Sequence, residues 1–142
     1  MLFMQNMTVS IDKESIVDGM HRNTALLAQK SENGAVIVYN DDDVQRLEPL
    51  WMASLDELLQ LFHPFARMSV TDKSAEYLLS MPANWDNSQE ETLTRLASGY
   101  LVTALTARWL DAVKPDSAML FRSLNSNTAN AINEVLYRRK RP

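Results

Sequence analysis

Residues 87–113 read NSQEETLTRLASGYLVTALTARWLDAV and contain the longest helical pattern of the chain. Ser88 and Glu91 have the spacing of a capping box, in which each side chain accepts a hydrogen bond from the other residue's backbone amide. Apolar residues then recur at three- and four-residue steps, as on the buried side of a helix: Leu93, Leu96, Ala97, Tyr100, Leu101, Ala104, Leu105 and Val113. Pro115 ends the pattern, because a proline pushes the preceding residue out of helical conformation. We expect a central scaffold helix here.

A first helix is predicted near the start of the chain. A β-prone piece, Thr8 to Ile11, is followed by acids and cap-type residues from Asp12 onward. Helical spacing then continues to about Lys30. Gly19 weakens this helix by about 1 kcal/mol relative to alanine, so its presence predicts close packing or a local bend at that position.

A second helix of about twenty residues is predicted after the acidic run Asp41 to Asp43, which is suited to helix capping. His63-Pro64 ends it. Pro49 lies inside the pattern, so we expect either a kink or a later start near Glu48. The brief β-prone run 35–39 that precedes this helix is too short to classify as strand or loop.

Residues 65–81 change to a period of two, which predicts a β-hairpin. Apolar side chains alternate with polar ones, in the order Ala66, Met68, Val70 and then Tyr77, Leu79, Met81. The turn falls at residues 71–74. A helix over residues 74–80 is the alternative, because Ala75, Glu76 and two adjacent leucines favour it.

A last helix is predicted after Pro115, with an apolar side formed by Leu120, Phe121, Leu124, Thr128, Ala131, Ile132, Val135 and Leu136. Its middle, residues 125–128, is poor helix material. We therefore expect either a break there or tertiary contacts that override the local preference. Together these patterns predict an α+β, mainly helical fold: a bundle of about four helices with one β-hairpin.

Length and composition predict one domain over residues 1–142. With 46% hydrophobic residues the chain can bury one core, but it is short for two ordinary domains. Residues 1–7 are expected to form a disordered leader or to contain an alternative start. The chain has no cysteine, which excludes disulfides, and no apolar run of the length of a membrane span. A cytoplasmic location, without membrane attachment, is the expectation.

Charge is divided unevenly along the chain. Residues 1–114 carry 9 basic and 16 acidic side chains, a net −7, whereas residues 115–142 carry 5 and 2, a net +3. The basic character is concentrated in Arg138, Arg139, Lys140 and Arg141, which are expected to form a tail over residues 138–142. This run predicts either a phosphate or partner contact, including nucleic acid, or simply a solvated helix end.

Familiar catalytic and metal-binding motifs are absent from the sequence. His21 and His63 are far apart, and the acidic run 41–43 lacks the alternating ligands of a calcium loop. With three glycines the chain cannot build a familiar phosphate-binding loop, and no nucleophile-elbow pattern occurs. We expect no metal, no cofactor and no enzymatic activity.

The residues 79–86, LSMPANWD, connect the hairpin to the long helix. This connector and the order of the predicted elements resemble those of small prophage-encoded virion structural proteins, which are similar to helical head-to-tail connector and head-completion proteins. The resemblance implies a non-enzymatic virion component that works by ring-forming self-association. We expect a homo-oligomer, or binding to other virion proteins, with Tyr77, Leu79 and Trp85 as candidate interface residues. The alternative for Trp85, which we favour, is packing over the entry of the long helix as a staple.

Overall fold

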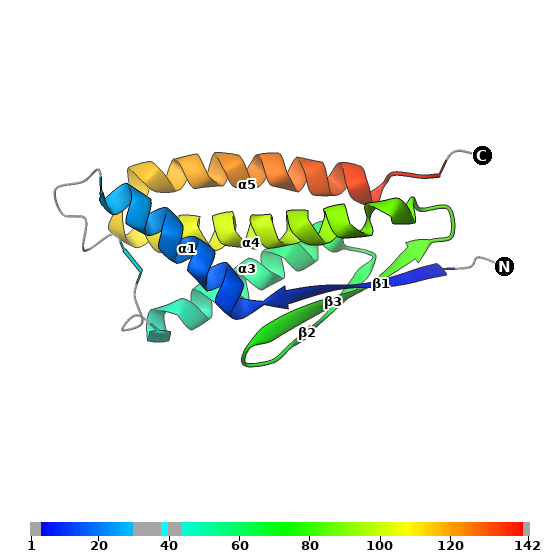
Figure 1. The fold of residues 1–142 in the computed structure, drawn as a ribbon, viewed down its shortest axis with the longest axis horizontal. Helices are drawn as coiled ribbons and strands as arrows, with labels where there is room; N and C mark the ends of the chain where they lie inside the picture. Colours follow the sequence, from blue (N-terminus) through cyan, green and yellow to red (C-terminus); the bar gives the residue numbers. More distant parts are fainter. Residues whose placement is uncertain (1–3, 30–37, 40–43, 141–142) are drawn as a thin grey trace.

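The computed structural model describes residues 4–29, 38–39 and 44–140. Its elements are β1 (Met4–Asp12), α1 (Lys13–Ala28), α3 (Val44–Phe62), β2 (Ala66–Val70), β3 (Ser74–Pro82), the 3-10 turn η2 (Asn87–Gln89), α4 (Glu90–Val113) and α5 (Pro115–Leu136). The described residues form four α-helices and one three-stranded antiparallel sheet, arranged as in Figure 1. The predicted α+β, mainly helical fold class is confirmed.

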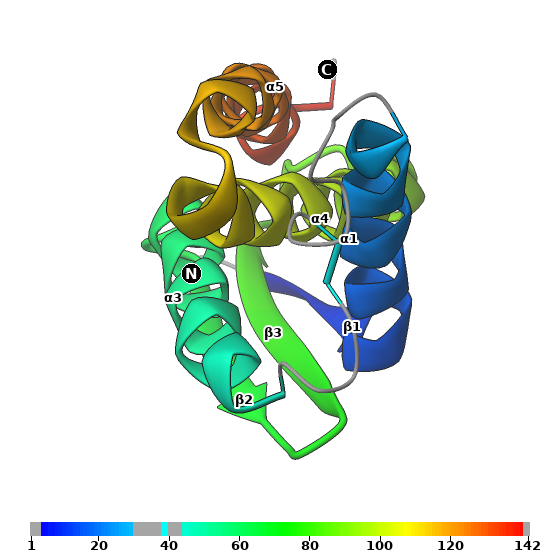
Figure 2. The same ribbon diagram turned by 90° about the vertical axis from the view of Figure 1, so that its left-hand side faces the viewer.

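The helix α4 lies at the centre of the fold, between α5 and the sheet (Figures 1 and 2). It packs against α5, α1, α3 and β1. Its buried residues are Leu93, Ala97, Tyr100, Leu101, Ala104, Leu105, Thr106, Ala107, Trp109 and Leu110. These side chains face neighbours on several sides, so the predicted role of this segment as central scaffold is confirmed.

The cap of this segment differs from the prediction. Asp86, and not Ser88, occupies the cap position: its carboxylate accepts from the Ser88 amide at 3.2 Å and from the Ser88 hydroxyl at 2.6 Å. One 3-10 turn therefore precedes α4, which begins at Glu90. The predicted capping box is wrong because an aspartate two residues earlier satisfies the first free amide.

The sheet has the strand order β1-β3-β2, with β3 in the middle. Residues 66–70 and 74–82 form the predicted hairpin, and the alternative helix over 74–80 is wrong. β1 adds a strand that the sequence did not predict to pair, with Met7 opposite Leu79 and Val9 opposite Tyr77. The expected leader over residues 1–7 is therefore wrong for Met4 to Met7, which belong to this strand.

Helices α1 and α3 flank the central helix. The predicted first helix is confirmed as α1, and the predicted second helix as α3. α3 begins at Val44 and continues through Pro49, so the later start near Glu48 is wrong. The acidic run 41–43 and most of the β-prone run 35–39 lie outside the described residues.

The helix α5 runs without a break through residues 125–128. Contacts to the other helices explain this: the Thr103 hydroxyl donates to the Asn125 side-chain oxygen at 2.7 Å, and the Asn125 amide donates to Glu57 at 3.2 Å. The predicted apolar side of this helix is only partly buried. Leu120 and Leu124 of this side are 56% and 42% exposed.

Gly19 on α1 allows this helix to approach α4 closely. A Cβ atom there would lie 2.9 Å from Cγ2 and 3.0 Å from Cγ1 of Val102, which confirms the close packing that the sequence predicted. Gly99, on the exposed side of α4, has nothing within 4 Å of such an atom. Gly19 and Gly99 can therefore be compared directly, because both lie in helices but only Gly19 packs closely against a neighbouring helix.

We expect opposite effects of alanine at these two positions. Gly19→Ala forces Val102 to move and should lower the free energy of unfolding by about 1–2 kcal/mol, because overpacking outweighs the gain in helix propensity. Gly99→Ala should raise it by about 0.5–1 kcal/mol, because alanine restricts the unfolded chain without a clash. Urea unfolding of both variants measures this. A Gly19→Ala protein as stable as the Gly99→Ala protein would contradict the close approach.

Candidate functional site

A polar network joins three helices at Glu57. Its carboxylate on α3 accepts hydrogen bonds from the Tyr100 hydroxyl and the Arg108 guanidinium of α4, and from Asn125 of α5. Burial, and then the adjacent Glu57, raises the pKa of Tyr100, so this phenol stays protonated and donates. No buried side-chain nitrogen or oxygen among the described residues lacks a hydrogen-bond partner, so the network has the arrangement of a structural clamp.

The predicted interface residues Tyr77 and Leu79 lie in the core. Tyr77 is fully buried, Leu79 is 1% exposed, and both face the helices. The Tyr77 hydroxyl donates to the Leu55 carbonyl at 2.7 Å, and its ring meets Phe62 edge-on at 5.2 Å. Burial raises the pKa of Tyr77, with a smaller contribution from Asp56. The prediction that these side chains contact a partner is wrong, because this face of β3 is already covered.

Trp85 is also fully buried, so its display to a partner is contradicted. Its indole Nε1 donates to the Val135 carbonyl at 2.9 Å. The bond ties the connector before α4 to the last turn of α5, 50 residues further along the chain. Trp85 is therefore part of the packing at the entry of α4.

The basic segment runs alongside the same connector. The Asp86 amide donates to the Arg138 carbonyl at 3.2 Å, and the Lys140 amide donates to the Asn84 carbonyl at 2.7 Å. Trp85 and Arg139 form a β-bridge. The predicted free tail is therefore wrong for residues 138–140, while Arg141 lies outside the described residues.

Arg138, Arg139 and Lys140 line a hollow of about 580 Å³ together with Asp86. Hydrogen bonds from Ser88, and then the charges of Arg138 and Lys140, lower the pKa of Asp86. The carboxylate therefore stays ionised beside these cations and offsets part of their charge. Phosphate or nucleic-acid binding by this run stays a prediction.

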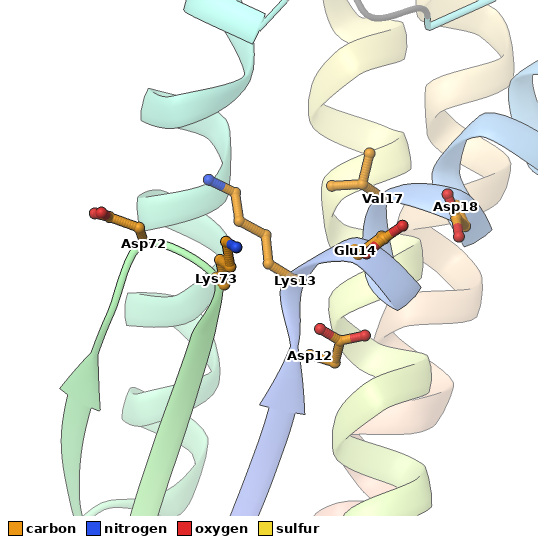
Figure 3. A pocket seen from close by; sticks show the side chains of 7 residues that line it. All are labelled: Asp12, Lys13, Glu14, Val17, Asp18, Asp72 and Lys73. Atoms are coloured by element: carbon orange, nitrogen blue, oxygen red, sulfur yellow. The ribbon is translucent and has the colours of Figure 1, made fainter.

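Another hollow, of about 500 Å³, lies where β1 passes into α1 (Figure 3). Its charged lining residues do not converge. Lys13 extends toward α3, where it pairs with Glu48, whereas Glu14 and Asp18 lie on the opposite side along α1. Among the described residues no group of three or more His, Cys, Asp or Glu side chains could hold a metal ion.

The outer edge of β1 exposes backbone groups that do not face β3. The Lys13 amide donates to the Lys73 carbonyl at 3.0 Å, so residues 13 and 73 form a hydrogen-bonded pair. Because such pairs alternate in an antiparallel ladder, odd-numbered residues of β1 bond to β3 and even-numbered residues direct their backbone groups outward. The outward set is Met4, Asn6, Thr8, Ser10 and Asp12. The outward groups of Met4, Asn6, Thr8 and Ser10 have no hydrogen-bond partner in the described part of the chain, whereas the Asp12 carbonyl accepts the first hydrogen bond of α1.

A groove borders this edge. Met7 and Thr8 of β1 line it on one side, and Glu90, Glu91, Thr94, Arg95 and Ser98 of α4 line it on the other, around a volume of about 350 Å³. Glu91 and Arg95 are exposed, and no ion pair of theirs occurs within the described ranges. The groove therefore provides space, and side chains of both charges, beside the outer edge of β1. The sequence signalled this edge only through the alternation of Thr8 and Ser10 with Val9 and Ile11.

No protein-family model matches the chain, and no curated protein or solved structure was found to be similar to it. None of the helices in the described segments combines the length and apolar character needed to cross a membrane. The candidate site is therefore defined by the geometry of this chain alone. From this geometry, we take the outer edge of β1 as the candidate site.

Proposed function

We propose that this is a non-enzymatic structural protein that works by self-association, in which a strand from a second copy adds to the open edge of the sheet. The observation that carries the proposal is the edge of the nine-residue strand β1, where the outward backbone groups of Met4, Asn6, Thr8 and Ser10 are unpaired within the described residues. Strand addition satisfies these groups with main-chain hydrogen bonds, which provide much of the affinity in this mode of recognition.

The residues of the edge also support this function. From Met4 to Ile11 the strand contains no charged residue, no proline and no glycine. Proteins that keep a sheet edge unpaired commonly protect it with a lysine, a proline or a bulge. An edge without such protection is suited to pairing.

A non-enzymatic role is supported by the way the polar groups are used. The clamp at Glu57 is satisfied internally, and the charged groups in Figure 3 point apart. The resemblance in element order to prophage-encoded connector proteins supports a place for this self-association in a virion assembly. Other virion proteins are then further candidate partners.

Light scattering over a wide range of protein concentration tests the proposal. We expect the molar mass to rise with concentration toward at least twice that of one chain. Because the pairing is made by neutral backbone groups, moderate salt should change the midpoint little. A mass that stays at one chain at every concentration would remove self-association as the function.

A further inference from the structure

The two open edges of the sheet differ in their suitability for pairing. β2 is five residues long and carries Arg67 near its middle, whereas β1 is nine residues long and uncharged up to Ile11. The groove against α4 adjoins β1. A longer edge makes more backbone hydrogen bonds, and a charged side chain disfavours edge-to-edge pairing. Both differences favour β1.

We infer that the partner of β1 is β1 of a second copy, aligned antiparallel about a two-fold axis at Thr8. This rests on the proposed self-association and specifies its interface. Residue 8 is the midpoint of the strand Met4–Asp12, so this register places all its outward-facing residues opposite one another. Thr8 faces Thr8, Asn6 faces Ser10, and Met4 faces Asp12 of the other copy. An interface of this kind is self-complementary by symmetry.

The side chains brought together by this register are compatible. Thr8, Asn6 and Ser10 are exposed on the outer face and can form cross-strand hydrogen bonds, with no like charges opposite one another. On the inner face, the groove of each copy carries two acids, Glu90 and Glu91, and one base, Arg95. A two-fold axis can bring Arg95 of one copy close to an acid of the other copy. If the grooves carried charge of only one sign, the two copies would repel each other.

The arrangement ends with two copies. Pairing of β1 with β1 joins both sheets into one, with the helices of both copies on the same face. The edges that remain are then the two short β2 strands, which carry Arg67. The interface predicts a closed dimer as the unit of assembly, and any larger ring would use other surfaces.

Proline substitutions test which of the two sheet edges forms the interface. Thr8 directs its amide outward, so Thr8→Pro leaves the bonds between β1 and β3 intact and removes a donor at the centre of the interface. Val70→Pro is the matched control. Thr71 donates to the Ser74 carbonyl at 2.9 Å, so residue 71 is in a hydrogen-bonded pair and the amide of Val70 also points outward, on β2.

We expect Thr8→Pro to weaken dimerisation by about tenfold or more, because each copy loses one hydrogen bond and gains a steric block. Val70→Pro should dimerise like the original protein. Sedimentation or light scattering at matched concentrations measures this, and circular dichroism checks that both variants fold. Association that survives Thr8→Pro, or is abolished by Val70→Pro, would overturn the β1 interface while leaving self-association standing. A monomeric original protein would remove both proposals.

Cysteine crosslinking tests the register without altering the backbone. The chain contains no cysteine, so any thiol link in a single-cysteine variant joins two copies. Thr8→Cys should be linked by a short bis-maleimide, which alkylates one thiol at each end, at concentrations where the protein dimerises, because directly opposed Cβ atoms lie about 5 Å apart. Ser123→Cys, on the exposed side of α5, is the control and should stay unlinked. Equal linking of both variants would overturn the register.

Discussion

Trp85→Ala is expected to lower the free energy of unfolding by about 3–5 kcal/mol, the range for removing a fully buried tryptophan. The indole fills the space between the connector and α5, and its N–H satisfies the Val135 carbonyl. Its loss leaves both a cavity and an unpaired buried acceptor. Urea unfolding monitored by circular dichroism measures the change.

Phenylalanine at the same position separates these two contributions. Trp85→Phe keeps most of the ring but loses the hydrogen bond, whereas Trp51→Phe is a control at an equally buried tryptophan whose indole makes no hydrogen bond within the described part of the chain. We expect Trp85→Phe to be the more destabilising by about 1 kcal/mol. Equal losses in the two variants would show that the bond to Val135 contributes nothing.

Glu57→Ala is expected to lower the free energy of unfolding by about 2–3 kcal/mol. The carboxylate accepts from Tyr100, Arg108 and Asn125 at once, and Tyr100 is only 2% exposed, so its hydroxyl would be left buried without a partner. Asn125 would also lose the contact that holds the weak middle of α5 in helical form. Hydrogen exchange over residues 125–128 should therefore rise more than elsewhere.

The ion pair between Arg122 and Asp111 provides the control. It also joins α5 to α4, but its side chains are 55% and 40% exposed. Arg122→Ala should cost at most about 1 kcal/mol, because exposed ion pairs contribute little. If Glu57→Ala costs no more than Arg122→Ala, then the Glu57 network is an ordinary surface contact and not a clamp.

Local patterns predicted the helices and the hairpin well, because periodicity reports which side of an element is buried. The long helix, its end before Pro115 and the alternation of Tyr77 and Leu79 all follow from the sequence. The pattern does not show whether the apolar side packs against the same chain or against another molecule. Tyr77 and Leu79 were assigned to an interface, although α3 and α4 of the same chain already cover that face.

Contacts between distant segments could not be predicted in the same way. β1 pairs with β3 across about seventy residues, and residues 138–140 pair with residues 84–86 through backbone atoms. Backbone pairing leaves no side-chain pattern that identifies the partner. For this reason the sequence predicts a leader where the strand at Met4 begins, and a free tail where residues 138–140 pair with the connector. The candidate site, which is a backbone edge, was missed for the same reason.

The placement of the described helices on one side of the sheet has a consequence for aggregation (Figure 2). No described element covers the opposite face. Its exposed side chains include the small polar residues Asn6, Thr8, Ser10, Ser69 and Ser80, together with the apolar Met4 and Leu78, which are 52% and 41% exposed. Polar side chains of this kind are well hydrated, so two sheets that stacked face to face would bury little apolar surface. Pairing then occurs only at the sheet edge, in the plane of the sheet, and the exposed strand β1 does not promote layered, amyloid-like deposits.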